Sequence, residues 1–150
     1  MESLDRRIIQ QLSKDSSASL TDLSEQLGVP SSTLHQRIKR LEARGVIKGY
    51  RADINQRQVG LTLHALVSLT PIDPARPDDI AEKLEQIEEV ESCWSVAGVE
   101  SYVVKVAVAE PVQLEELLGR IRTLANVSTR TTIILSTPFE GRQANIPEEQ

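Results

Sequence analysis

Residues 28–45, GVPSSTLHQRIKRLEARG, decide how the N-terminal third of this 150-residue chain folds. Leu34, Ile38 and Leu41 recur at intervals of four and three residues, which predicts a helix with one buried face. Ser31 is the expected N-cap of this helix, and Gly45 is expected to end it. Before Ser31, a turn is predicted over residues 28–30, because glycine favours a left-handed cap and proline cannot continue a helix.

Two further helices are predicted before this turn. Ser19 is a candidate N-cap with Asp22 three residues later, which is the spacing of a capping box. The helix after Ser19 and the opening segment of the chain both carry apolar residues at helical spacing. These residues are Leu20, Leu23 and Leu27 in the later helix and Leu4, Ile8, Ile9 and Leu12 in the first. Two short helices joined by a turn at residues 28–30 match the outline of a helix-turn-helix.

The outward face of the helix that follows residue 30 indicates contact with DNA. Short polar and amide side chains read base edges in the major groove, and arginine and lysine contact guanine edges and phosphates. A short strand pair is predicted over residues 46–54, the place of a wing. The candidate DNA-binding residues are Ser31, Ser32, Thr33, Gln36, Arg37, Lys39, Arg40, Lys48 and Arg51. The alternative is a generic three-helix packing unit, in which an arginine such as Arg40 pairs with a neighbouring carboxylate.

The net charge of −5 averages two regions of opposite sign. Residues 1–60 carry 10 Lys and Arg against 7 Asp and Glu, whereas residues 61–150 carry 7 against 15. Seven of the basic residues lie within residues 31–57, beside only two acidic ones. This asymmetry predicts two modules with different partners, and the basic stretch is where a polyanion would be attracted.

The rest of the chain alternates predicted strands and helices after a linker over residues 56–62. The pattern first predicts a strand over 63–70 and then a helix capped by Asp78 that buries Ile80, Leu84 and Ile87. Strands over 90–97 and 102–108 follow. The last two elements are a helix that starts near Pro111, with an apolar stripe that ends at Leu124, and a strand over 127–136. This βαββαβ order is the ferredoxin-like unit. The expected fold class is therefore α+β, with a winged helix-turn-helix and linker over residues 1–60 and a ferredoxin-like domain over residues 61–150.

The predicted sheet leaves one face uncovered. Both helices of a ferredoxin-like unit pack on the same face, and the other face here carries Val, Trp, Thr and Ile side chains. An apolar face without a cover usually marks an interface. We therefore expect a homodimer formed through these sheets.

Residues typical of catalysis are not grouped in this sequence. The two histidines, His35 and His64, fall in different modules, and the single cysteine, Cys93, is expected to be a small core residue of its strand. No P-loop or nucleophile motif is present, and one cysteine excludes an internal disulfide. We therefore predict no enzyme, no cofactor and no metal. With no apolar run long enough for a membrane span and no secretory signal, the expected location is the cytoplasm.

Two motifs of this chain resemble one protein family. LTDLSEQLGV at residues 20–29 and RIKRLEARGVIKGY at residues 37–50 are similar to the DNA-binding domain of the Lrp/AsnC family, the feast/famine transcription regulators. The resemblance extends from about Leu4 to Thr137. It implies a winged helix-turn-helix that binds a palindromic double-stranded DNA operator, followed by an effector-binding and oligomerisation domain. It also implies a homodimer that often assembles into an octamer, and an amino acid as the small-molecule effector.

The resemblance also implies where the effector binds. Carried onto this sequence, it assigns Gly98, Glu100, Ser101 and Tyr102 near the turn between the second and third strands, and Thr132 and Ile134 in the fourth. A glycine turn exposes backbone amides for a carboxylate, and Glu100 can accept from an ammonium group. Val99 and Ser101 stand where the family often has Asp, so the resemblance does not name the effector.

Two other classes of function stay open at this point. One is a ligand-binding oligomerisation protein whose helix-turn-helix mediates protein contacts. The other is an enzyme built on the ferredoxin-like scaffold. A gel shift of DNA that weakens with salt would distinguish a DNA-binding regulator from the oligomerisation protein. An acid and a base side chain that lie close together in space would indicate the enzyme.

Overall fold

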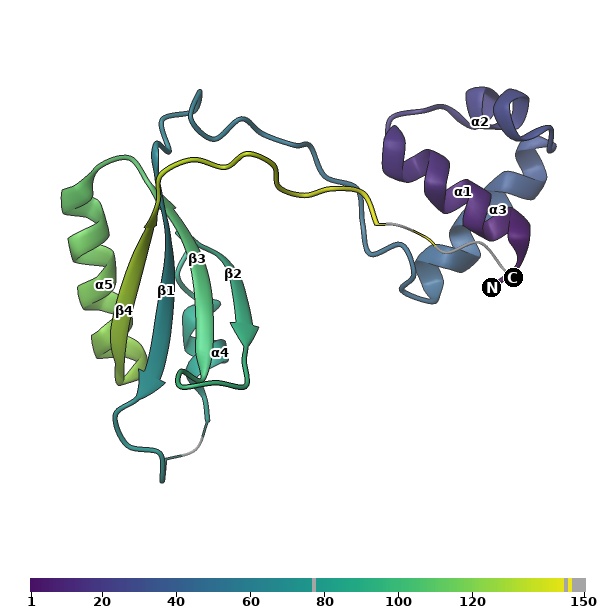
Figure 1. Ribbon diagram of the computed structural model, residues 1–150. Coiled ribbons are helices and arrows are strands. Elements are labelled where there is room, and N and C mark those ends of the chain that lie inside the picture. Colours follow the sequence, from purple (N-terminus) through teal and green to yellow (C-terminus); the bar gives the residue numbers. More distant parts are fainter. Residues whose placement is uncertain (77, 145, 147–150) are drawn as a thin grey trace. The chain divides into compact units, whose positions relative to one another are not determined.

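The chain divides into two compact units. The computed structural model describes residues 1–76, 78–144 and 146 (Figure 1). One unit contains Met1–Asp53 together with a C-terminal segment that starts at Phe139, and the other contains Ile54–Pro138. Each unit has a hydrophobic core of its own. Among the described residues, no helix is long and apolar enough to cross a membrane.

The N-terminal unit packs three helices, α1 (Ser3–Lys14), α2 (Leu20–Leu27) and α3 (Ser31–Ala43). The predicted apolar stripes of the three helices meet in one core, which confirms the three-helix arrangement and its inward faces. The buried side chains of this core are Ile8, Leu23, Leu27, Leu34, Ile38 and Leu41.

The turns around α2 follow the predicted capping chemistry. The Ser19 hydroxyl accepts from the Asp22 N–H at 3.1 Å, and the Asp22 carboxylate accepts from the Ser19 N–H at 3.1 Å, so the capping box is confirmed. Gly28 ends α2 in the left-handed conformation with φ of 66°. The prediction for Ser31 is wrong, because Pro30 is the N-cap of α3 and Ser31 is its first helical residue.

The strand pair predicted over residues 46–54 is also wrong. The N–H groups of Val46 and Ile47 both donate to the Leu41 carbonyl, at 3.0 and 3.2 Å, directly after Gly45 takes a φ of 69°. These two amides both satisfy the Leu41 carbonyl near the end of α3 and are not available for a strand ladder. Residues 44–62 form turns, bends and irregular backbone without a helix or strand.

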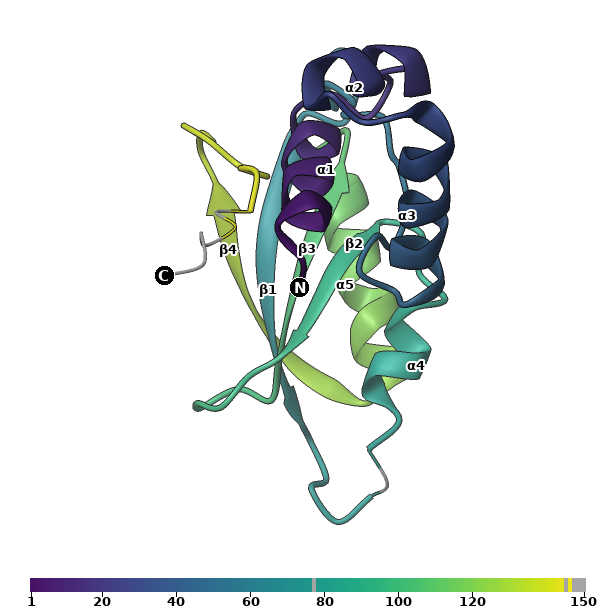
Figure 2. The same ribbon diagram turned by 90° about the vertical axis from the view of Figure 1, so that its right-hand side faces the viewer.

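The second unit is a four-stranded antiparallel sheet with two helices. The strands are β1 (Leu63–Pro71), β2 (Val90–Ser95), β3 (Tyr102–Val108) and β4 (Val127–Ile134), in the spatial order β2-β3-β1-β4. Helices α4 (Ile80–Leu84) and α5 (Pro111–Ala125) pack on one face of this sheet (Figure 2). The element order and the strand order confirm the predicted ferredoxin-like unit.

Three details of this unit differ from the prediction. Asp79, not Asp78, occupies the N-cap position of α4, and the Asp78 carboxylate accepts from the Tyr102 hydroxyl at 2.7 Å. Leu124 is 40% exposed, because Ala125, four residues after Ile121, turns inward in its place. Cys93 is exposed, because β2 is an edge strand and its residues are at most half-buried.

The face of the sheet away from the helices is uncovered in this unit. Leu66 and Ser68 of β1 lie on this face, since their neighbours Ala65, Val67 and Leu69 are fully buried on the other. Across the sheet, Leu66 pairs with Lys105 and Thr132, and Ser68 pairs with Val103 and Arg130. Trp94, which pairs with Val103, is 48% exposed at the edge. We call this surface the open sheet face.

Candidate functional site

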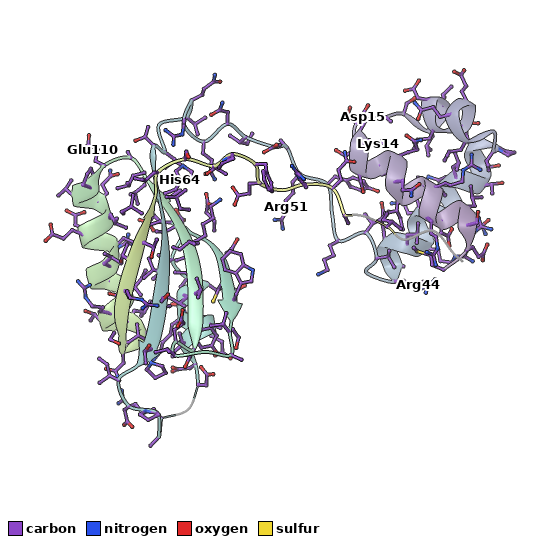
Figure 3. All side chains as sticks on the ribbon, viewed as in Figure 1. Lys14, Asp15, Arg44, Arg51, His64 and Glu110 are labelled. Carbon is purple, nitrogen blue, oxygen red and sulfur yellow. The ribbon has the colours of Figure 1, made fainter. Side chains whose placement is uncertain are left out.

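The predicted DNA-binding residues of α3 lie mostly at the surface of the N-terminal unit. Since Leu34, Ile38 and Leu41 point into the core, the opposite side of α3 is open to solvent. Arg44 at the end of α3 and Arg51 on the following segment are seen in Figure 3. Of the predicted residues, the exposed ones are Ser32, Gln36, Lys39, Arg40, Lys48 and Arg51, and the half-buried ones are Ser31, Thr33 and Arg37.

Arg37 and Arg40 are joined to two carboxylates of α1 and its N-cap. Arg37 Nη1 lies 2.9 Å from Asp5 Oδ1 and 2.6 Å from Glu2 Oε2. Arg40 Nη2 lies 3.5 Å from Glu2 Oε1 and 3.6 Å from Asp5 Oδ2. The hydrogen bonds that Arg37 donates, first to Asp5 and then to Glu2, raise the pKa of Arg37 above its ordinary value. We call these four residues the arginine–carboxylate cluster.

The two carboxylates of this cluster differ in environment. The Asp5 side chain is 2% exposed, whereas that of Glu2 is 59% exposed. A buried carboxylate is stable only with partners that replace its hydration, so Arg37 is tied to Asp5 by the packing of α1 on α3. Sequence reasoning missed Asp5, although the signal was present: Asp5 lies three and four residues before Ile8 and Ile9, on the stripe that packs inward.

Lys39 is paired within its own helix. Its Nζ lies 2.9 Å from Glu42 Oε2, and the Tyr50 hydroxyl donates to Glu42 Oε1 at 3.0 Å. These two contacts, that with Lys39 first, lower the pKa of Glu42. Partial burial, and then Glu42, raise the pKa of Tyr50. The Lys39 side chain is 64% exposed, so this ion pair contributes little and leaves the ammonium able to exchange partners.

The predicted effector residues fall on different sides of the sheet. Glu100 accepts from the Ser68 hydroxyl at 3.2 Å and lies 3.8 Å from Arg130 Nη2, and both of these residues belong to the open sheet face. Thr132 and Ile134 lie on the same face, opposite Leu66 and His64. The structure therefore brings the Glu100 carboxylate close to Arg130 of β4.

Tyr102 and Ser101 lie elsewhere. Tyr102 is buried on the helix side of the sheet, where its hydrogen bond to Asp78 and its burial raise its pKa to about 12. The Ser101 N–H donates to the Leu69 carbonyl at 3.0 Å, which closes the β2–β3 connection onto β1. A Cβ added to Gly98 would lie 3.9 Å from Glu100 Oε2, so Gly98 and the Glu100 carboxylate are neighbours.

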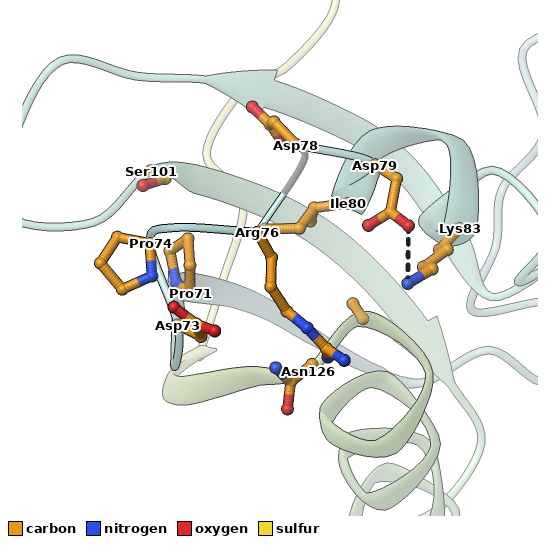
Figure 4. Close-up of a pocket in the computed structure, with 11 residues that line it drawn as sticks. Pro71, Asp73, Pro74, Arg76, Asp78, Asp79, Ile80, Lys83, Ser101 and Asn126 are labelled. Carbon is orange, nitrogen blue, oxygen red and sulfur yellow. Dashed lines mark ion pairs between the residues drawn. The ribbon is translucent and has the colours of Figure 1, made fainter.

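A hollow of about 490 Å³ lies where the β1–α4 loop meets the α5–β4 junction (Figure 4). Its charged side chains include both signs, and the Lys83 ammonium is 2.8 Å from the Asp79 carboxylate. Ser101 is the predicted effector residue that lines it. Its lining residues are Pro71, Asp73, Pro74, Arg76, Asp78, Asp79, Ile80, Lys83, Ser101, Ala125 and Asn126.

A metal-binding arrangement is absent from the part of the chain that the structure describes, where no three His, Cys, Asp or Glu side chains are grouped to hold an ion. His35 lies in the N-terminal unit and His64 in the second unit. The His64 imidazole contacts the Leu61 carbonyl at 2.9 Å, as part of the chain entering β1.

Comparison with known proteins finds a matching family model for each part of the chain. Residues 1–48 match the family model for winged helix-turn-helix DNA-binding domains, and residues 62–144 match the Lrp/AsnC ligand binding domain. The chain is 51% identical over 143 residues to the HTH-type transcriptional regulator LrpA of Mycobacterium tuberculosis, and the aligned residues cover 95% of both chains. It is 31% identical over 150 residues to the leucine-responsive regulatory protein of Haemophilus influenzae, covering 97% of this chain and 88% of that one.

A solved structure agrees with these matches. The feast or famine regulatory protein from M. tuberculosis, complexed with L-methionine, superposes with a TM-score of 0.93 at 51% identity, covering 95% of this chain and 97% of that one. The two family matches divide the chain into a helical and an α+β part, as the two structural units do.

Proposed function

Because the chain belongs to the Lrp/AsnC family of helix-turn-helix transcription regulators, we propose that it binds DNA sequence-specifically and responds to a small molecule, an amino acid. The observation that carries this proposal is the solvent face of α3, where polar and basic side chains lie outside a helix whose other face is fully buried. The relatives are named as regulators, and we propose no catalytic role.

We divide the DNA contacts by chemistry. Ser31, Ser32, Thr33 and Gln36 lie in the first half of α3, the part of a recognition helix that reaches base edges. Basic side chains farther along contact phosphates, which fix the register of the protein on the duplex. These are Arg37, Lys39, Arg40, Lys48 and Arg51. We assign residues 1–60 to DNA binding and the linker, and residues 61–150 to effector binding and assembly.

The effector site that we propose centres on Glu100. Its carboxylate is only 23% exposed and already accepts from Ser68, so it is fixed in place to accept from an ammonium group, which would compete with Arg130. Gly98 supplies backbone near this carboxylate, and Thr132 and Ile134 extend the site along β4. Ser101 follows Glu100 directly and ties this turn to β1 through the hydrogen bond from its N–H to the Leu69 carbonyl. The methionine complex of the M. tuberculosis relative supports an amino acid as ligand. Tyr102 supports the site from the core side through Asp78.

The assembly that we propose is a homodimer through the open sheet face, with further association into an octamer. One recognition helix in one major groove gives limited affinity, so a two-fold dimer on a palindromic operator is the physical expectation. A DNA-binding regulator of this kind works in the cytoplasm, where the DNA is accessible.

A selection of bound genomic fragments, with and without a panel of amino acids, tests this function. We expect enrichment of one palindromic sequence, a shift of the upstream DNA that weakens steeply with salt, and a change in the selected set with at least one amino acid. Failure to shift any DNA at low salt would contradict the proposal. That result would favour a ligand-binding oligomerisation protein whose helix-turn-helix contacts other proteins.

A further inference from the structure

The arginine–carboxylate cluster has an asymmetry that a purely structural ion pair does not need. Asp5 is buried and already has Arg37 as its partner at 2.9 Å. Glu2 is largely exposed, yet its carboxylate lies 2.6 Å from Arg37 and 3.5 Å from Arg40. Although Glu2 is the N-cap residue of α1, its side chain makes no capping hydrogen bond. The exposed carboxylate therefore serves the two arginines and not its own helix.

From this arrangement we propose that Arg37 and Arg40 form a binding site for a backbone phosphate of DNA, and that the Glu2 carboxylate occupies this site in the free protein. The inference rests on the proposed function, because it takes DNA as the partner. It goes beyond the phosphate contacts already proposed by joining the two arginines in one anion site, and it makes Glu2 a competitor that DNA must displace.

The geometry of α3 places both guanidinium groups on one anion. Positions 37 and 40 are three residues apart, so their side chains lie on the same side of the helix. A carboxylate and a phosphate present similar oxygen acceptors to a guanidinium group, so a group that binds one can bind the other. Replacing Glu2 by a phosphate requires no rotation of Arg37, because Asp5 keeps its hold on the same nitrogen.

The burial of the two acids explains why only one of them can leave. Removing the Asp5 carboxylate from its arginine would strand a charge with 2% exposure, whereas Glu2, 59% exposed, returns to water at little cost. Asp5 is thus a positioning residue that holds Arg37 ready, and Glu2 is the exchangeable cap. A site that is ordered before the ligand arrives loses less conformational entropy on binding.

The variant Glu2→Gln, with any affinity tag at the C-terminus, tests this inference. Glu25→Gln is the matched control, because it removes one exposed carboxylate from α2 of the same unit. Binding to a random-sequence DNA duplex and to the selected operator is measured at several salt concentrations. We expect Glu2→Gln to tighten binding to both duplexes about 2- to 5-fold more than Glu25→Gln does, which is the size of an exposed ion pair.

A second background separates the mechanism from a general charge effect. In Arg40→Gln, one of the two partners of Glu2 is gone, so the gain from Glu2→Gln should shrink. An unchanged gain would overturn the role of the arginine pair, and a gain on the operator alone would overturn the assignment to phosphate. Equal gains in DNA affinity for Glu2→Gln and Glu25→Gln would overturn the role of Glu2 as a competitor and leave the proposed function intact. Failure of the wild-type protein to bind either duplex would instead contradict the proposed function.

Discussion

Asp5 is a buried carboxylate of the N-terminal unit, and its stability there depends on Arg37. The variant Arg37→Ala should lower the free energy of unfolding by about 3 kcal/mol, because it leaves the buried Asp5 charge without its nearest partner. Chemical denaturation followed by helix ellipticity measures this loss. Arg44→Ala, an exposed arginine next to the end of the same helix, is the control and should change stability by less than about 0.5 kcal/mol. Equal losses in the two variants would contradict the role of Asp5.

Tyr102 makes the stability of the second unit depend on alkaline pH. Its hydrogen bond to Asp78 at 2.7 Å raises its pKa to about 12, above the ordinary value of 10. Between these two values the unfolded chain loses the phenolic proton and the folded chain keeps it, so the free energy of unfolding falls as pH rises from about 10 to 12. The fall attributable to this group is roughly 2–3 kcal/mol.

Urea denaturation at pH 9 and at pH 11.5 checks this dependence when the wild-type protein is compared with Tyr102→Phe. Ionisation of other groups at alkaline pH affects both proteins alike, so only the difference between the two proteins reports Tyr102. Phenylalanine keeps the ring in the core and removes the titrating group. The prediction is wrong if both proteins lose the same stability between the two pH values.

At the scale of elements, replacing glycine by alanine should have opposite effects on stability at two positions. Gly28 ends α2 with φ of 66°, a conformation that costs an L-residue about 1 kcal/mol or more. Gly119 lies inside α5, where alanine is favoured over glycine by up to about 1 kcal/mol. A Cβ at either position meets no atom within 4 Å, so sterics do not decide the sign. Gly28→Ala should therefore destabilise the protein, and Gly119→Ala should stabilise it.

Amide hydrogen exchange resolves these two effects, because it reports each unit separately. Protection of the α2 and α3 amides should fall in Gly28→Ala, and protection of the α5 and β3 amides should rise in Gly119→Ala. Fluorescence of Trp94, the single tryptophan, follows the second unit alone. Two changes of the same sign would show that backbone conformation does not control these positions.

The elements were predictable where one local force decides them. Apolar spacing identified α1, α2, α3 and α5, and the Ser19–Asp22 capping box and the Gly28 turn follow from chemistry within a few residues of each other. The strand pair predicted over residues 46–54 does not form, because the N–H groups of Val46 and Ile47 donate to the Leu41 carbonyl instead. The alternation of residue types in the sequence does not reveal this competing hydrogen bonding.

The candidate site was less predictable than the fold for the same reason. Helical periodicity identified the exposed side of α3, but the partners of Arg37 lie 32 and 35 positions away in the chain. Likewise, Glu100 and Tyr102 are two residues apart but their side chains lie on opposite faces of the sheet. Which face a turn residue takes depends on register with β1 and β4, which pairwise spacing in the sequence does not specify.

At the scale of the whole molecule, the distribution of charge matters more than its sum. The net charge of −5 combines a basic stretch over residues 31–57 with an acidic second half. For the proposed DNA binding, this distribution predicts that nonspecific attraction is confined to the region that carries α3, because an acidic region repels a polyanion. A regulator with this distribution presents one attractive surface per chain, so two-fold pairing is the direct way to add a second.

That pairing is expected through the open sheet face, and Trp94→Glu tests it. In a two-fold interface each copy contributes the same patch, so one substitution removes two indole rings from the contact and places two carboxylates there, which weakens association. Sedimentation velocity at micromolar concentration should give a dimer or larger species for the wild-type protein and a folded monomer for Trp94→Glu. Val112→Glu is the matched control, because Val112 is 53% exposed on α5, which packs on the opposite face, and its assembly should be unchanged. A stable wild-type monomer at this concentration would refute the interface, and loss of assembly in Val112→Glu as well would move it to the helices.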